Sequence, residues 1–209
     1  METRPAKECP VYHFMPDIVE EKLSDKDLVQ KARNGDNNAF RRLVEQNQHK
    51  VAATVIGMLG NCPEADDVGQ ETFIRFYRSL DQFRGESSVG TYLTRIAINL
   101  SLNELKRRKR RNTLFFSRSE VKMETAPEKN DPKKKKELKE IVRLGLEKLD
   151  PKHRAVAVLR LIEGYSTKET ARILRLPAGT VLSRLARAQK KLREILTPLY
   201  WEGDVFKEE

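Results

Sequence analysis

A stretch of basic and hydroxyl side chains near the C-terminus, GTVLSRLARAQKKL (residues 179–192), has the clearest binding chemistry in this sequence. On a helix of about 3.6 residues per turn, its apolar positions fall on one stripe. These positions are Val181, Leu185, Ala188, Leu192 and Ile195. The flank away from the stripe carries Thr180, Ser183, Arg184, Arg187, Lys190 and Lys191. Arginine suits bidentate contacts to guanine and lysine suits contacts to phosphate, so this helix could bind DNA, although such faces are also typical of solvated surface.

The segment before this helix favours the DNA-binding interpretation. Ser166 and Glu169 have the spacing of a capping box, which predicts a short helix over residues 167–174 with Ala171 and Leu174 facing inward. A break containing Pro177 then separates it from the basic helix. A short helix, a tight break and a longer basic helix are the plan of a helix-turn-helix. A plain two-helix packing corner is the weaker alternative.

The whole chain has the charge of a protein with a polyanionic partner. It has 209 residues, of which 34% are charged, and a net charge of +10. Its richest apolar run, VAATVIGMLG, is too short to cross a membrane, and the first twenty residues lack the pattern of a secretory signal. Cys9 and Cys62 are far apart in sequence, which suggests reduced thiols. We therefore expect a cytoplasmic protein.

Motifs of catalysis and of cofactor binding are missing from the sequence. It contains no phosphate-cradling glycine loop, no Gly-Lys-Ser/Thr and no His-Glu-x-x-His. His13, His49 and His153 are isolated, so they would join the cysteines in a zinc site only by chance folding. We expect no enzymatic activity, no metal and no cofactor.

The hydrophobic periodicity predicts helices, and no strand pattern competes with it. In the N-terminal half the expected helices span residues 25–34, 37–60, 64–80 and 89–110. The polar, lysine-rich composition of residues 112–136 predicts a flexible linker. The sequence thus predicts an all-α protein with two small helical domains, residues 25–111 and 137–196, joined by this linker. An acidic arm (residues 1–24), poorly ordered or ordered only against a partner, and a tail (residues 197–209) flank them.

The third predicted helix has an acidic start. Glu64, Asp66, Asp67 and Glu71 crowd its first turns. Acidic residues stabilise a helix N-terminus through the helix dipole, but such a cluster also suits docking of a basic partner, and both interpretations remain open. The apolar residues predicted to line its buried side are Val68, Phe73, Phe76, Tyr77 and Leu80.

The loop FRGESS and the helix that follows it have features of a nucleic-acid surface. Gly85 permits a tight loop, and Phe83 beside Arg84 places an aromatic ring next to a cation where a base could stack. One side of the next helix carries Arg95, Asn99, Asn103, Lys106 and the remainder of the run KRRKRR. A surface helix with a basic, nuclear-localisation-like tail is the alternative. Periodic packing together with the aromatic loop favours nucleic acid.

These motifs resemble two regions of a known family. Residues 65–103, with ADDVGQETFIRFYRSL, FRGESS and TYLTRIAIN, resemble region 2 of bacterial sigma factors of the extracytoplasmic-function group. Residues 137–196, with LEKLDPKHRAVAVLRLIEGYSTKETARIL and GTVLSRLARAQKKL, resemble their region 4. The resemblance covers about residues 25–111 and 137–196, in the family's order. Leu182 departs from the pattern, because the family commonly has a charged residue there.

The resemblance implies a role for each matching position. The face that holds the clamp helices of core RNA polymerase is matched by Asp66, Asp67, Gln70 and Glu71. The loop that captures a flipped base of the −10 element is matched by Phe83, Arg84, Gly85, Glu86, Ser87 and Ser88. The helix that guides the single strand is matched by Arg95, Asn99, Asn103, Lys106, Arg107 and Arg108. The −35 reading helix is matched by Thr180, Ser183, Arg184 and Arg187, with Lys190 and Lys191 behind them.

The resemblance therefore implies a transcription initiation factor. Such a protein would bind core RNA polymerase, recognise −10 and −35 promoter DNA and promote melting, in response to an envelope or stress signal. An anti-sigma factor is a partner implied by the family alone. The alternative is a stand-alone helix-turn-helix regulator, which would leave the FRGESS loop and the acidic helix without a function.

Overall fold

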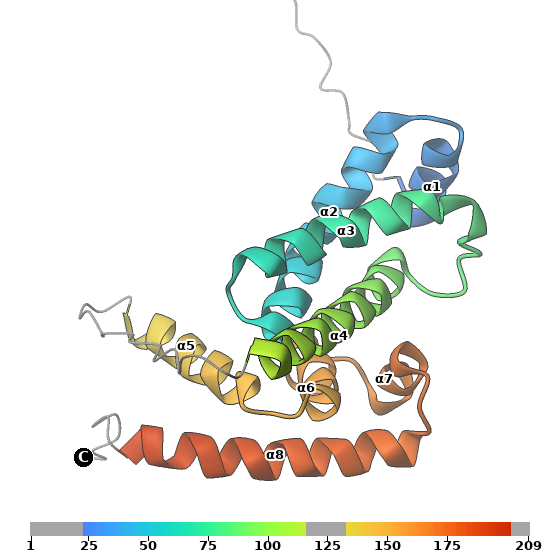
Figure 1. Ribbon diagram of the computed structural model, residues 1–209. Coiled ribbons are helices and arrows are strands. Elements are labelled where there is room, and N and C mark those ends of the chain that lie inside the picture. The colour runs from blue at the N-terminus through green and yellow to red at the C-terminus, as the bar shows by residue number, and fades with distance from the viewer. Residues whose placement is uncertain (1–22, 116–132, 202–209) are drawn as a thin grey trace, which may run out of the picture.

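The computed structural model describes residues 23–115 and 133–201, and every regular element within them is a helix (Figure 1). The helices of the N-terminal half are α1 (Asp25–Arg33), α2 (Asn37–Leu59), α3 (Pro63–Arg78), the 3-10 turn η1 (Leu80–Gln82) and α4 (Val89–Phe115). Those of the C-terminal half are α5 (Lys133–Glu147), α6 (Pro151–Ala157), the π-helical turn η2 (Val158–Ile162), α7 (Thr167–Leu174) and α8 (Ala178–Trp201). The predicted all-α fold is confirmed. The predicted arm up to Lys22, residues 116–132 of the predicted linker and residues 202–209 of the tail lie outside the described residues.

Capping residues explain where several helices begin. Ser24 and Asp27 form a capping box at α1, with the Asp27 amide donating to Ser24 Oγ at 3.3 Å. The predicted box of Ser166 and Glu169 is present at α7, where the Ser166 amide donates to Glu169 Oε2 at 2.8 Å. Each box satisfies amides that the first turn of a helix leaves without partners. Arg175, at φ +53°, ends α7 in the left-handed conformation.

Helices extend into both ends of the predicted linker. Helix α4 continues to Phe115, and α5 begins at Lys133, so helical residues replace the first and last residues predicted to be flexible. Lysine and arginine have good helix propensity, and Glu104 pairs with Arg107 at 2.8 Å along α4. A basic composition therefore did not exclude a helix.

Helix α2 lies at the centre of the N-terminal half, with α1, α3 and α4 packed around it. Leu28, Leu43, Phe76 and Leu93 are fully buried between these helices. Tyr77, predicted to be buried, is 50% exposed. It follows Phe76 by one position on α3, which turns it to the edge of the apolar stripe, where its ring packs edge-on against Phe40 at 4.9 Å.

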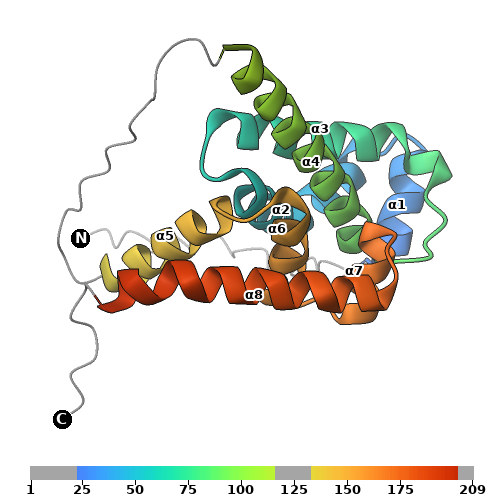
Figure 2. The same cartoon turned by 60° about the horizontal axis from the view of Figure 1, so that its bottom comes forward.

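In the C-terminal half, α8 runs along α5, α6 and α7 (Figures 1 and 2). Its apolar stripe is confirmed by the full burial of Val181 and Ala188. In α7 the buried residues are Thr170 and Ile173, whereas Ala171 and Leu174, predicted to face inward, are half-buried. The spacing of three residues places Thr170 and Ile173 on the same face, so the inward face of α7 is rotated by one residue from the prediction.

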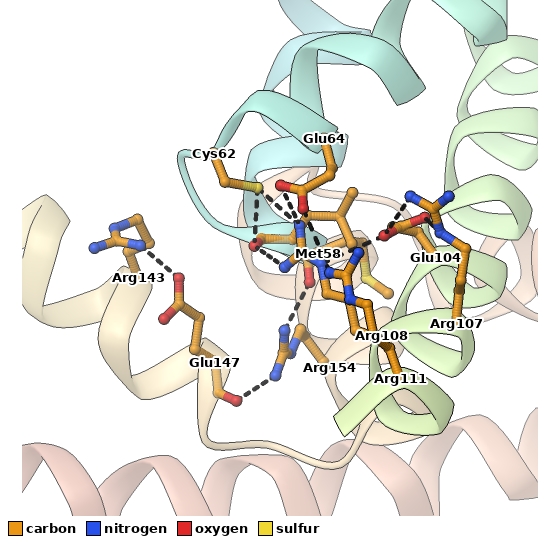
Figure 3. A network of polar contacts seen from close by, with 11 residues as sticks. Met58, Cys62, Glu64, Glu104, Arg107, Arg108, Arg111, Arg143, Glu147 and Arg154 are labelled. Atoms are coloured by element: carbon orange, nitrogen blue, oxygen red, sulfur yellow. Dashed lines mark hydrogen bonds and ion pairs between the residues drawn. The ribbon is translucent and has the colours of Figure 1, made fainter. Parts of the chain in front are cut away.

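The two halves pack directly on each other through a contact that we call the domain seam. It is formed by α2 and α4 on one side and by α5, α6, η2 and α7 on the other. The buried side chain of Arg154 donates to Met58 O across the seam at 2.7 Å, and also to the carbonyls of Glu147 and Leu149 within its own half (Figure 3). The hydroxyls of Thr94 and Tyr165 share a hydrogen bond of 3.1 Å. Backbone geometry brings α2 close to η2 at Gly57, which faces Val158.

One carboxyl group in the seam is energetically unfavourable as an anion. Glu163 is half-buried, and Thr54 donates to its Oε1 at 3.3 Å. Burial raises the pKa of Glu163 above its ordinary value of 4.5, and the nearby Lys50 and the Thr54 hydrogen bond only partly oppose this. Because the folded state then binds the proton more tightly than the unfolded state, the stability from Glu163 is present at low pH and is lost as pH rises through the raised pKa.

We therefore expect Glu163→Gln to raise the melting temperature at neutral pH, because the amide has no charge to desolvate. The advantage should shrink as pH falls below the raised pKa toward 4.5, where the parent carboxyl is protonated. Thermal unfolding across this pH range measures the effect, and Glu45→Gln on the exposed surface of α2 is the control. A melting difference that is independent of pH would contradict the assignment.

Among residues 23–115 and 133–201, no helix combines the length and apolar character needed to span a bilayer. The same residues contain no group of three or more His, Cys, Asp or Glu arranged to hold a metal ion.

Candidate nucleic-acid interface

The loop between η1 and α4 presents polar residues to solvent from two fixed ends. Residues 84–88 are all exposed, and Gly85 adopts φ +71°, the left-handed conformation that glycine tolerates best. At the C-terminal end, Ser88 Oγ accepts the Thr91 amide at 3.2 Å and so caps α4. At the N-terminal end the chain enters the loop from the buried residue Phe83. The predicted loop is therefore a short, solvent-facing segment anchored on both sides.

Phe83 is largely buried in this structure, whereas its predicted role as a stacking surface for a base requires an accessible ring. Its side chain is 7% exposed, and its ring packs against Phe76 at 6.0 Å and Tyr92 at 5.1 Å. Both contacts are edge-on, a favourable arrangement for aromatic rings. The ring fills space between α3 and α4, so the exposed residues of the loop are Arg84, Gly85, Glu86, Ser87 and Ser88. Phe83 still lines part of the cavity beside them.

Helix α4 keeps only part of its predicted polar face free. Asn99, Asn103 and Lys106 are exposed. Arg107 is exposed but pairs with Glu104 at 2.8 Å.

Arg108, also predicted to guide the single strand, points back into the N-terminal half. It contacts Cys62 Sγ at 2.9 Å, Glu64 Oε2 at 3.2 Å and Leu59 O at 3.2 Å (Figure 3). Because these groups at the α2–α3 turn already occupy its guanidinium, Arg108 has a structural role in this arrangement.

Arg95, another predicted strand-guiding residue, faces α7. Its Nη2 donates to Arg172 O at 3.1 Å. A cavity of about 900 Å³ opens between the loop, the first turn of α4 and α7, and Arg84, Arg95 and Arg172 are among its lining residues. No local sequence pattern indicated this proximity, because Arg95 and Arg172 are 77 positions apart. Glu86 and Glu169 line the same cavity, so its lining carries charges of both signs.

The acidic start of α3 divides into paired and unpaired residues. Glu64 accepts from Arg108 and lies 3.7 Å from Arg111, and Glu71 pairs with Arg75 at 2.7 Å. Asp66, Asp67 and Gln70 are exposed, and neither aspartate forms an ion pair with another described residue. Three of the four residues predicted to dock the polymerase thus lie on one open surface, and Glu71 lies beside them within an ion pair.

The predicted −35 flank of α8 is accessible to solvent. Ser183, Arg187, Lys190 and Lys191 are exposed, whereas Thr180 and Arg184 are half-buried. Lys191 pairs with Glu194 at 3.3 Å. Leu182, which interrupts the polar flank, is 54% exposed. Buried Val181 and Ala188 hold the opposite side of the helix, so the cations extend away from the core.

Comparisons with known proteins identify both halves. The model of sigma-70 region 2 matches residues 43–111, and the model of sigma-70 region 4 matches residues 145–194. The RNA polymerase sigma-H factor of Pseudomonas aeruginosa is 35% identical over 189 residues, which cover 86% of this chain and 97% of that protein. The chain belongs to the sigma-70 family. It is a transcription initiation factor of the extracytoplasmic-function group.

Further relatives of this sigma factor agree with that assignment. The ECF RNA polymerase sigma-E factor of Escherichia coli is 38% identical over 191 residues, covering 86% of this chain and 97% of that protein. The solved structure of CnrH, in complex with the cytosolic domain of CnrY, has a TM-score of 0.62 and 29% identity, covering 83% of this chain and 97% of CnrH. The sigma factor RpoE of Bartonella quintana, solved with the anti-sigma factor NepR, has the same fold, with a TM-score of 0.60 and 22% identity over 76% of this chain and 96% of RpoE.

The burial of Phe83 gives a test that separates packing from base stacking. Phe83→Ala should destabilise the protein by about 3–5 kcal/mol, whereas Phe83→Leu, which retains much of the apolar volume, should cost far less. Denaturant unfolding of both variants measures the difference. If Phe83→Ala unfolds like the parent but the protein loses binding to −10 single strands, the ring acts on DNA and the packing interpretation fails.

Proposed function

We propose that this sigma factor binds core RNA polymerase through α3 and directs it to promoters through two separate DNA contacts. The loop of residues 84–88 and the exposed face of α4 would bind the −10 strand, and α8 would read the −35 duplex. The observation that carries this proposal is the presence of two exposed polar surfaces, one on each of the two helical units that match regions 2 and 4. The polymerase, and not this chain, would perform the chemistry.

The −10 contact would rely on the loop residues that stay exposed. Because Phe83 is largely buried, capture of a base would rely mainly on the Arg84 cation, the Ser87 and Ser88 hydroxyls and the open backbone at Gly85. Asn99, Asn103 and Lys106 continue this surface along α4. These groups can hydrogen-bond a base edge or contact phosphate, which are the two kinds of contact that hold a single strand.

Promoter binding would also require the domain seam to open. With the two halves packed together, which we call the closed arrangement, Arg95 donates a hydrogen bond to the backbone of α7. Helix α7 also lines one side of the cavity beside the loop of residues 84–88. Separation of the halves would release Arg95 and expose the cavity to DNA. We further propose an anti-sigma partner in the bacterial cytoplasm, released in response to an envelope or stress signal. RpoE of Bartonella quintana was solved in complex with the anti-sigma factor NepR.

The polymerase contact is tested by Asp67→Lys. Reversal of this exposed charge should weaken core binding, because the proposed docking surface would then repel a basic partner. The loss should be greatest at low salt, since salt screens exposed charges. Glu45→Lys changes the charge equally at an exposed position on a different helix, α2, and should bind core polymerase as the parent does. Equal affinities of Asp67→Lys and the parent in a competition assay would refute the docking role.

The −35 contact is tested by Arg187→Ala. Loss of a bidentate base contact should weaken promoter binding by about 1–3 kcal/mol and relax the preference at one −35 position. Thermal unfolding should be unchanged, because Arg187 is exposed. Arg193→Ala, an exposed arginine later in α8, is the matched control. If Arg187→Ala retains the parent's selectivity among −35 variants, this face of α8 is ordinary solvated surface.

A further inference from the structure

An arginine outside every surface described so far contacts the start of the loop of residues 84–88, which we call the −10 loop. Arg33 is the last residue of α1 and is half-buried. Its Nε donates to Leu80 O at 2.8 Å, and its Nη2 donates to Phe83 O. These partners are 47 and 50 positions away in sequence. The guanidinium therefore joins the end of α1 to the backbone that leads into the loop.

The two carbonyls are the two ends of one short turn. The Phe83 amide donates to Leu80 O at 3.2 Å and closes η1, so Leu80 O accepts from both this amide and Arg33. The Phe83 carbonyl belongs to the peptide group that connects to Arg84, the first exposed residue of the loop. A planar guanidinium with donors in a fixed fork can hold two acceptors in one relative orientation, which a lysine ammonium cannot do equally well. Arg33 thus sets the direction in which the chain leaves Phe83.

The loop has few other restraints. None of residues 84–87 forms a hydrogen bond with another described residue. The backbone conformation of these residues is determined by its ends: the Ser88 cap on α4 at one end, and the Phe83 ring with the Arg33-bound carbonyl at the other. We therefore expect a change at either end to shift the position of the loop.

We infer that Arg33 is a positioning residue for −10 recognition. It acts through the Phe83 carbonyl and does not touch DNA itself. A binding group discriminates between ligands only when its neighbours hold it in place, so loss of Arg33 should reduce base selectivity more than overall affinity. This inference rests on the proposed −10 role of residues 84–88.

The test uses holoenzyme assembled from the full chain and core polymerase. The probe is a pool of fork-junction DNA randomised in the −10 single strand, and binding selects the preferred sequence. The readout is the ratio of affinities for that sequence and for its one-base variants. A general loss of folded protein lowers both affinities equally and leaves the ratio unchanged, so the ratio separates positioning from stability.

Arg33→Met keeps the aliphatic stem but removes both hydrogen bonds, and should lower the ratio by about fivefold or more. Arg33→Lys, which can reach one carbonyl, should give an intermediate ratio. Arg41→Met removes an exposed arginine from α2 and should match the parent. Core polymerase affinity and −35 duplex binding should be unchanged in all three variants.

Two loop variants, Arg84→Ala and Ser87→Ala, distinguish failure of the inference from failure of the proposed function. If they lower the ratio and both Arg33 variants leave it at the parent value, Arg33 has no positioning role. If the loop variants also leave it unchanged, the −10 role of the loop fails, and the inference fails with it. Should Arg33→Met not fold, Arg33→Lys alone decides: a lowered ratio supports the inference and the parent ratio refutes it.

Discussion

The buried guanidinium of Arg154 is the interaction on which the closed arrangement of this sigma factor depends. Arginine retains its charge at any accessible pH, so its burial is tolerated only where carbonyl oxygens replace water. Arg154 finds three of them, at Met58, Glu147 and Leu149, and only the first belongs to the N-terminal half. Burial still lowers the pKa of Arg154, and its Nε has no partner among the described residues. Two of the acceptors lie in the C-terminal half, and the third, Met58 O, is available only while the two halves are packed together.

The same seam connects the two candidate DNA surfaces. It places α7 beside the −10 loop and uses Arg95, a candidate strand contact, as one of its hydrogen-bond donors. The aromatic group of Phe76, Phe83 and Tyr92 fixes the N-terminal side of this region independently of the seam. Opening the seam would therefore move α7 away from the loop, while the aromatic group of Phe76, Phe83 and Tyr92 would stay in place.

Local patterns predicted the features that depend on neighbouring residues. The Ser166–Glu169 capping box and the apolar stripe of α8 follow from spacings of three and four residues, and the structure contains both. The ends of α4 and α5 were missed because a basic composition is compatible with either a linker or a helix. The burial of Phe83 was not predicted because its environment is created by rings on α3 and α4. Arg33 and Arg95 donate to partners that are 47 to 77 positions away in the sequence, and no local pattern can predict contacts between residues so far apart in the chain.

At Gly57 the seam depends on a close steric fit between α2 and η2, in addition to its polar contacts. A Cβ atom at this position would lie 3.0 Å from Val158 Cγ2, closer than carbon atoms normally approach. Bare backbone on α2 thus meets the branched side chain of Val158 on η2, and a methyl group at Gly57 would fit only if Val158 shifted. The close approach of α2 to η2 therefore depends partly on the absence of a side chain at Gly57. A single added carbon could tune the balance between closed and open sigma factor while every DNA- and polymerase-facing side chain stayed the same.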